Sequence, residues 1–300
     1  MSGESRSPSD VFSVRVHAAA PARPEPDALE VSPPVVALVR DLVHDRTGVY
    51  FPDSRSGELV ERLGPLVLER GFPSLLDYYY LLKYDAAAAE EWGRVFDALA
   101  VPETYFWREV DQVRAIVQHV VPDLVKTLGG RPLSIWSIPC ASGEEPLSIA
   151  MMLDQEGWFA RTAIEIHGSD ASPAAIDRAR RGVYRDRSFR NLPPALRERY
   201  FSFAGDAWRI DPDLHRRVTW SVVNLMDATQ AGPRAAAPIV FWRNLLIYFS
   251  ERASRDAVNL FAARMPARGC LAIGVSESLL KLTNDFELVE IGGAFVYVRR

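Results

Sequence analysis

Residues 134–150 read SIWSIPCASGEEPLSIA, and this stretch decides how the rest of the chain is interpreted. A short apolar run leads into a Ser-Gly turn, two carboxylates and the apolar spacing of a helix. This is the strand–turn–helix unit that opens cofactor-binding α/β domains. The two glutamates fall in the first helical turn, where backbone N–H groups and the helix dipole favour an anion, and a phosphate-binding loop would leave that place to the phosphate. The acidic turn therefore predicts a ligand with a cationic group and argues against a nucleotide polyphosphate.

Strands and helices alternate from residue 132 onward, which predicts a mostly parallel, doubly wound α/β sheet with helices on both faces. The C-terminal run FELVEIGGAFVYVRR places Gly292-Gly293 between two alternating segments, the pattern of an antiparallel hairpin at the sheet edge. The expected strands are 133–138, 164–169, 218–223, 239–242 and 270–275, and the expected helices are 144–153, 173–181 and 251–265.

The first hundred residues have a different pattern. Residues 1–33 are rich in Ser, Pro, Ala and Arg, which predicts a disordered tail. Apolar residues at helical spacing then predict a small all-α bundle with helices at 34–47, 56–70, 74–84 and 86–99. The predicted division is a tail at 1–33, a helical domain at 34–100, a linker with one helix at 101–130, and a cofactor-binding domain at 131–300.

Composition argues against several functional classes. The net charge of −4 offers no basic excess for nucleic acid. The two cysteines, Cys140 and Cys270, form no metal-ligand spacing and no disulfide framework, so we expect no metal and a reducing cytoplasm. The sequence contains no apolar run that spans a bilayer and no signal-peptide pattern. We therefore predict a cytoplasmic protein that does not insert into a membrane.

Chemically useful residues follow the expected strands at their carboxyl ends, where open α/β sheets bind ligands. Glu145 follows the first strand, Asp170 the second, Asn224 the third and Arg243-Asn244 the fourth. A carboxylate such as Asp170 can accept hydrogen bonds from both hydroxyls of a ribose, although capping of the next helix is an alternative. Glu145 can meet an ammonium group, or it can only offset the helix dipole.

A nucleoside with an amino-acid tail and a sulfonium centre, S-adenosyl-L-methionine, fits these residues better than NAD, which needs a glycine-rich turn. Arg108 is the candidate for the tail carboxylate. Four aromatic side chains can line a pocket for a positively charged sulfur: Tyr105, Phe106, Trp107 and Tyr248. For Tyr105 and Trp107, a core plug beneath a domain junction remains the alternative.

The segments PETYFWRE, CASGEEPLSIAM, GSDASPAAIDRARRGVY, RNLLIYF and GVSES occur in an order that resembles the CheR-type chemotaxis receptor glutamate O-methyltransferases, from about residue 35 to the C-terminus. The resemblance implies an all-α domain ahead of a Rossmann-like S-adenosylmethionine-dependent methyltransferase domain. It implies methyl transfer to glutamate side chains of chemoreceptors, giving γ-glutamyl methyl esters and S-adenosylhomocysteine. The implied partner is the receptor's cytoplasmic helical domain, and we expect a monomer. The PET variant resembles a branch that often carries tetratricopeptide repeats, and this sequence contains none.

The resemblance also implies site residues. Arg108 and Tyr248 match the residues close to the transferred methyl and are the expected catalytic pair. This sequence departs from many family members at Pro102, Trp242 and Val275. The positions that match the family's cofactor contacts are Thr104, Arg108, Glu145, Asp170, Asn224, Leu225, Arg243 and Asn244.

Two expectations concern the receptor. Arg55, Arg62 and Arg70 flank the second helix and either face an acidic receptor helix or form a solvated surface. The stretch 200–217 is short, so we do not expect the receptor tail to be gripped there by the small β-subdomain that some members carry. Two other functions stay open: a methyltransferase with a nitrogen or hydroxyl acceptor, which would need a base, and a cofactor-binding scaffold or sensor without turnover. His167 is expected to be structural rather than that base.

Overall fold

This computed structural model describes residue 29 and residues 31–300, so the tail predicted at 1–33 lies almost wholly outside the described residues. The predicted helical bundle is present, and each helix ends within two residues of its predicted bounds. Val39, Leu63 and Val95 are fully buried in its core, as the helical spacing requires. The bundle helices are α1 (Pro33–Thr47), α2 (Ser56–Glu69), α3 (Leu75–Tyr84) and α4 (Ala88–Leu99), with a 3-10 turn η2 (Asp53–Arg55).

The linker leads from the bundle to the sheet. Its helical part is α5 (Val110–Ala115), a π-helical segment η3 (Ile116–Val120) and α6 (Val121–Thr127), where the sequence predicted one helix. Phe106 is fully buried, with its ring centroid 4.8 Å from that of Tyr184 and 5.0 Å from that of Phe201. Phe106 is therefore the core plug of the aromatic run, and it anchors the start of the linker.

The main sheet has seven strands in the order β6-β2-β1-β7-β8-β10-β9, and the first five are parallel. The predicted hairpin at Gly292-Gly293 adds β9 and β10 as the antiparallel end. The α/β fold class is confirmed. The strands are β1 (Leu133–Ser137), β2 (Ile164–Asp170), β6 (Val218–Val222), β7 (Ile239–Phe241), β8 (Cys270–Ala272), β9 (Phe286–Ile291) and β10 (Ala294–Arg299).

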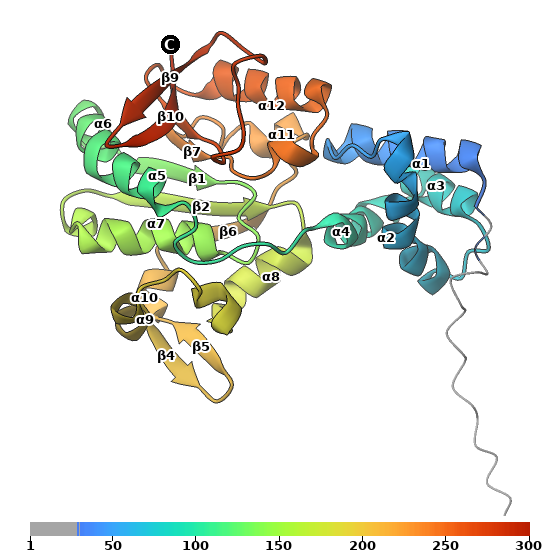
Figure 1. Ribbon diagram of the computed structural model, residues 1–300, viewed down its shortest axis with the longest axis horizontal. Helices are drawn as coiled ribbons and strands as arrows, with labels where there is room; N and C mark the ends of the chain where they lie inside the picture. Colours follow the sequence, from blue (N-terminus) through green and yellow to red (C-terminus); the bar gives the residue numbers. More distant parts are fainter. Residues whose placement is uncertain (1–28, 30) are drawn as a thin grey trace, which may run out of the picture.

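Two buried clusters lie on opposite faces of this sheet. Leu133 and Ile135 of β1 face one cluster, and Trp136, the next residue, faces the other, because side chains alternate along a strand. Helices α5 and α7 cover the first face, and α12 covers the second (Figure 1). The helices of this domain are α7 (Glu144–Gln155), η4 (Trp158–Ala160), α8 (Pro173–Arg181), α11 (Ala228–Ala231), η6 (Leu246–Tyr248) and α12 (Glu251–Arg264).

A second, small sheet was not predicted. It has the order β3-β5-β4 and is built from strands of two to four residues, too short to give a clear period in the sequence. The stretch 200–217 thus does form part of a β-subdomain. Its elements are β3 (Val183–Tyr184), η5 (Asp186–Phe189), α9 (Pro194–Tyr200), β4 (Phe201–Ala204), β5 (Ala207–Ile210) and α10 (Pro212–His215).

The helical bundle contacts the sheet domain on two sides. On one side, Asp97 of α4 accepts hydrogen bonds from Ser172 Oγ and, at 3.0 Å, from Ala174 N at the start of α8. On the other, Val49 pairs with Phe249 in an antiparallel bridge. The bundle therefore covers the carboxyl ends of the strands. Over the range 31–300, no helix combines the length and the apolar character needed to cross a membrane.

Candidate functional site

A cavity of about 260 Å³ lies between the bundle, the linker and the carboxyl ends of β1, β2, β6 and β7. The structure brings every predicted site residue to its wall, although they come from segments far apart in the chain. Within the described part of the chain, no polar contact fixes the side chains of Thr104, Leu225 and Tyr248. The nine residues are Thr104, Arg108, Glu145, Asp170, Asn224, Leu225, Arg243, Asn244 and Tyr248.

The turn after β1 depends on Gly143. Its φ is +97°, and a Cβ added there would lie 2.8 Å from Cη2 of Trp220. Both facts exclude a side chain, so glycine is required for α7 to begin directly behind the strand. Glu144 points into the protein, where it accepts hydrogen bonds from Ser142 Oγ at 2.8 Å and Ser188 Oγ at 2.9 Å. Burial raises the pKa of Glu144.

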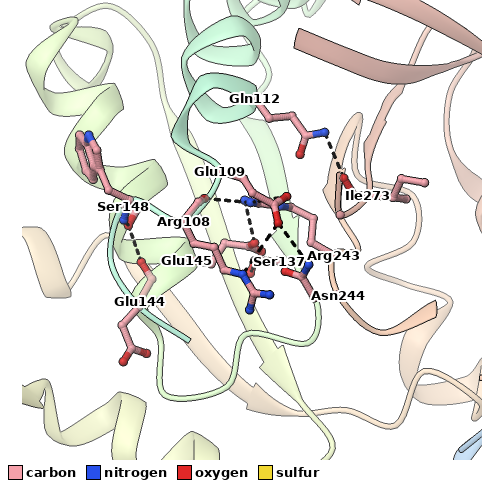
Figure 2. A network of polar contacts seen from close by, with 12 residues as sticks. Arg108, Glu109, Gln112, Ser137, Glu144, Glu145, Ser148, Arg243, Asn244 and Ile273 are labelled. Atoms are coloured by element: carbon pink, nitrogen blue, oxygen red, sulfur yellow. Dashed lines mark hydrogen bonds and ion pairs between the residues drawn. The ribbon is translucent and has the colours of Figure 1, made fainter. Parts of the chain in front are cut away.

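Glu145 lies beside a cation. Its Oε1 accepts a hydrogen bond of 2.7 Å from Ser137 Oγ, and its Oε2 is 3.1 Å from Nη1 of Arg243. Burial raises the pKa of Glu145, although the Arg243 guanidinium opposes that shift. The carboxylate is thus already paired, which sequence reasoning did not foresee. Figure 2 shows this pair within a larger network of polar contacts.

Arg243 is the centre of that network. Its side chain is 1% exposed, its Nη2 lies 3.0 Å from Glu109 Oε2, and the same nitrogen donates to the Arg108 carbonyl at 2.8 Å. Its Nε is buried and has no hydrogen-bond partner among the described residues. Arg243 therefore joins the tip of β7 to the linker.

Asp170 stabilises the turn after β1. Its Oδ2 accepts from Ala141 N and its Oδ1 from Ser172 N, both at 2.9 Å. Ser172, and not Asp170, caps α8, because Ser172 Oγ accepts from Ala175 N at 3.0 Å. Asp170 lines the cavity, and a carboxylate can accept hydrogen bonds from both hydroxyls of a vicinal diol. Burial raises the pKa of Asp170.

Arg108 presents its guanidinium to the cavity. Its Nη1 donates to the Glu103 carbonyl at 2.7 Å, and the side chain is 27% exposed. The ring of Tyr105 lies between two cations, with Arg190 at 3.6 Å from its centroid and Arg108 at 5.7 Å. Trp107 is buried, and its backbone N donates to Ser148 Oγ at 3.1 Å. Both Tyr105 and Trp107 line the cavity, so neither is only a core plug.

Three predicted residues also serve as structural links. Asn224 Nδ2 donates to the Arg46 carbonyl of α1 at 2.8 Å, so this side chain connects the two domains. Asn244 has φ +60°, and its backbone N donates to Glu277 Oε2 at 2.9 Å. The carbonyl of Tyr248 accepts a hydrogen bond of 2.9 Å from Tyr50 N, so the bundle fixes the backbone of this catalytic candidate.

Sequence reasoning missed Glu109 and Glu277. Glu109 contacts Arg243, Asn244 and Val275, and Glu277 Oε2 accepts from the backbone N of Asn244 and of Gly274. Both lie inside segments quoted for the family resemblance, ETYFWRE and GVSES, which was the available signal.

The three arginines considered for receptor contact differ in their partners within the protein. Arg70 donates to Glu91, whose side chain is fully buried, at 2.7 Å. Arg62 donates to the Ala98 and Leu99 carbonyls at the end of α4, both at 3.2 Å. These two arginines stabilise the bundle, which contradicts a purely solvated helix face. Arg55 pairs with Glu58 on the surface, and Arg55 and Arg62 both line the cavity.

Of the three positions that depart from many family members, Pro102 lines the cavity, whereas Trp242 and Val275 do not. Trp242 is fully buried beside Phe249 and Phe261, and Val275 is 75% exposed. His167 lies on β2, and burial lowers its pKa. Among the described residues, no histidine lines the cavity and no group of His, Cys, Asp and Glu side chains is arranged for a metal ion.

Comparison with known proteins gives consistent matches. Residues 102–294 match the family model of the CheR methyltransferase SAM binding domain, and residues 36–100 match that of the CheR methyltransferase all-alpha domain. Chemotaxis protein methyltransferase 2 of Vibrio cholerae is 34% identical over 252 residues, 83% of this chain and 87% of that protein. Chemotaxis protein methyltransferase 1 of Pseudomonas aeruginosa is 29% identical, covering 87% of this chain and 96% of its own. The probable biofilm formation methyltransferase WspC of Pseudomonas putida is 32% identical, over 83% of this chain and 60% of that protein.

Proposed function

This chain belongs to the CheR methyltransferase family, and from that premise we propose that it methylates glutamate side chains of chemoreceptors with S-adenosyl-L-methionine as the methyl donor. The products are γ-glutamyl methyl esters and S-adenosylhomocysteine. The observation that carries the proposal is the convergence of nine predicted residues on one cavity between the two domains. The names of the chemotaxis relatives support chemoreceptors as the acceptors.

The cavity offers each polar part of the donor a suitable partner. Asp170 has a carboxylate for the ribose hydroxyls, Glu145 has another carboxylate for the ammonium, and Arg108 has a partly exposed guanidinium for the carboxylate. The Nε of Arg243 is buried and has no hydrogen-bond partner among the described residues, so it adds one more polar group beside the site. We assign Thr104, Asn224, Leu225 and Asn244 to the surrounding walls of the same binding site.

The proposed reaction does not need a general base. When bound, S-adenosylmethionine supplies a methyl group on a positively charged sulfur. The acceptor glutamate is already ionised at neutral pH, since its ordinary pKa is about 4.3, so the absence of a histidine from the described cavity wall fits the chemistry. The residues need only align the reactants and exclude water, effects that can reach about 7–11 kcal/mol. We assign alignment to Arg108 and the shape of the methyl pocket to Tyr248.

The finer features of the proposal concern the partner and the setting. The acceptor is the cytoplasmic helical domain of a chemoreceptor. Arg55 and Arg62 at the cavity wall supply positive charge that suits an acidic helix; Arg55 shares its charge with Glu58, whereas Arg62 donates to backbone carbonyls. We propose a cytoplasmic monomer, divided at residues 33, 100 and 130. Tethering through a receptor tail is not part of the proposal.

The deciding experiment uses methyl-labelled cofactor and purified receptor cytoplasmic domains. We expect label on the receptor that mild base releases as methanol, which distinguishes a methyl ester from methylated nitrogen or an ether. Receptor with its methylatable glutamates changed to alanine is the control. Base-stable label would indicate a different acceptor, and cofactor binding without any receptor label would support a scaffold or sensor.

A further inference from the structure

Four charged side chains meet where the linker passes the tips of β1 and β7, as Figure 2 shows. Arg243 lies between two carboxylates, with Nη1 3.1 Å from Glu145 Oε2 and Nη2 3.0 Å from Glu109 Oε2. Arg108 Nε lies 3.9 Å from Glu109 Oε1. The cluster therefore contains two cations and two anions, and its formal charge is zero.

The charge of Arg243 needs a neutralising partner, because its side chain is 1% exposed and a buried unpaired charge is costly. If Glu145 were the sole partner, its negative charge would be cancelled and would offer an incoming ammonium no net attraction. Glu109 supplies a second carboxylate. With Glu109 paired to Arg243, one negative charge remains at Glu145 and one positive charge at Arg108, the complement of a zwitterionic amino-acid tail.

Glu109 itself lies behind the cavity wall rather than on it. Its carboxylate also accepts hydrogen bonds from Asn244 Nδ2 at 3.3 Å and Val275 N at 3.2 Å. Burial alone would raise the pKa of Glu109, but Arg243 and these donors lower it overall, so the carboxylate is ionised at neutral pH. Its φ of +49° is uncommon for a residue other than glycine, and these contacts compensate the strain.

We propose that Glu109 is a positioning residue for the amino-acid tail: it neutralises Arg243, so that the negative charge of Glu145 is not cancelled and can attract the ammonium group. The inference rests on the proposed function, in which that ammonium lies at Glu145. Glu109 acts through Arg243 and does not touch the ligand. Its effect is selective, because it concerns the ammonium and not the ribose or the base.

The test compares S-adenosylhomocysteine with its deaminated analogue, which keeps the ribose, sulfur and carboxylate. The dissociation constant of the deaminated analogue divided by that of S-adenosylhomocysteine measures how much the ammonium group contributes to binding. Glu109→Gln preserves the side-chain shape and removes the charge, and we expect it to lower this ratio about tenfold, which corresponds to about 1.4 kcal/mol. Asp111→Asn is the matched control, because the Asp111 side chain is 78% exposed and, among the described residues, its ion pair is with Arg114. An unchanged ratio in Glu109→Gln overturns the inference.

Glu145→Gln separates this inference from the function on which it rests. If Glu145→Gln abolishes the preference and Glu109→Gln does not, only the role of Glu109 is wrong. If Glu145→Gln leaves the preference intact, the ammonium does not lie at Glu145 and the proposed arrangement of the site fails. If Glu109→Gln does not fold, Glu109→Asp replaces it. Because aspartate keeps the negative charge, we expect an unchanged ratio of dissociation constants, and a tenfold lower ratio would overturn the inference.

Discussion

The replacement Asp170→Asn tests the cofactor site most directly. Asp170 is 9% exposed, and each of its oxygens already accepts one backbone N–H at 2.9 Å. Asp170 lines the cavity, where a ribose would donate two hydroxyl hydrogens to its carboxylate. Asparagine keeps one acceptor oxygen, but it turns an amide nitrogen toward either Ala141 N or Ser172 N. The variant therefore loses the negative charge and one of the two acceptors.

The expected loss follows from these contacts. A hydrogen bond to a charged group contributes about 1.5–3 kcal/mol, so losing one and weakening the other costs about 2–3 kcal/mol of binding. That corresponds to about 30- to 150-fold weaker binding of S-adenosylhomocysteine. The unpaired backbone N–H should also reduce the free energy of unfolding by about 1–3 kcal/mol.

Calorimetry with S-adenosylhomocysteine and its 2′-deoxy analogue provides the assay. The wild-type protein should prefer the ligand with the intact diol, and Asp170→Asn should largely lose that preference. Asp177→Asn is the control, because the Asp177 side chain is exposed on α8 and forms its ion pair, within residues 31–300, with Arg180. The reasoning is refuted if folded Asp170→Asn binds S-adenosylhomocysteine with wild-type affinity, or if both variants lose affinity equally.

Two further outcomes follow from the same geometry. Gly143→Ala should lower the free energy of unfolding, measured by urea denaturation, by about 1–3 kcal/mol. Gly129→Ala should lower it less, because the Cβ added there meets nothing within 4 Å. Equal losses in the two variants would contradict the clash with Trp220. Burial raises the pKa values of Asp170 and Glu145, so these groups take up protons on modest acidification, and the affinity for the cofactor should then fall. The effect on the stability of the unliganded protein has the opposite sign: a raised carboxyl pKa stabilises the folded protein at low pH, and this contribution is lost as pH rises. Calorimetry and thermal melting between pH 8 and pH 5 measure the two effects, and an affinity independent of pH would contradict the prediction.

Local patterns in the sequence predicted the main elements well. The bundle helices, the five parallel strands and the Gly292-Gly293 hairpin each have a period or a turn signal within a short window. Where that window was too short, as in β4 and β5, the prediction failed. The π-helical segment at Ile116–Val120 gave no signal either, because its apolar spacing resembles that of an ordinary helix.

The residues that lie at the strand tips could be identified from the chain alone, since a turn glycine and the acid that follows it are adjacent in sequence. How the charges of these residues are shared depends on the folded protein. Glu109 and Asn244 are 135 positions apart, and Asp97 and Ser172 are 75 apart, so no local pattern relates them. The pairing of Glu145 with Arg243, the second carboxylate at Glu109 and the closure of the cavity by the bundle all depend on side chains that meet only after the sheet has formed.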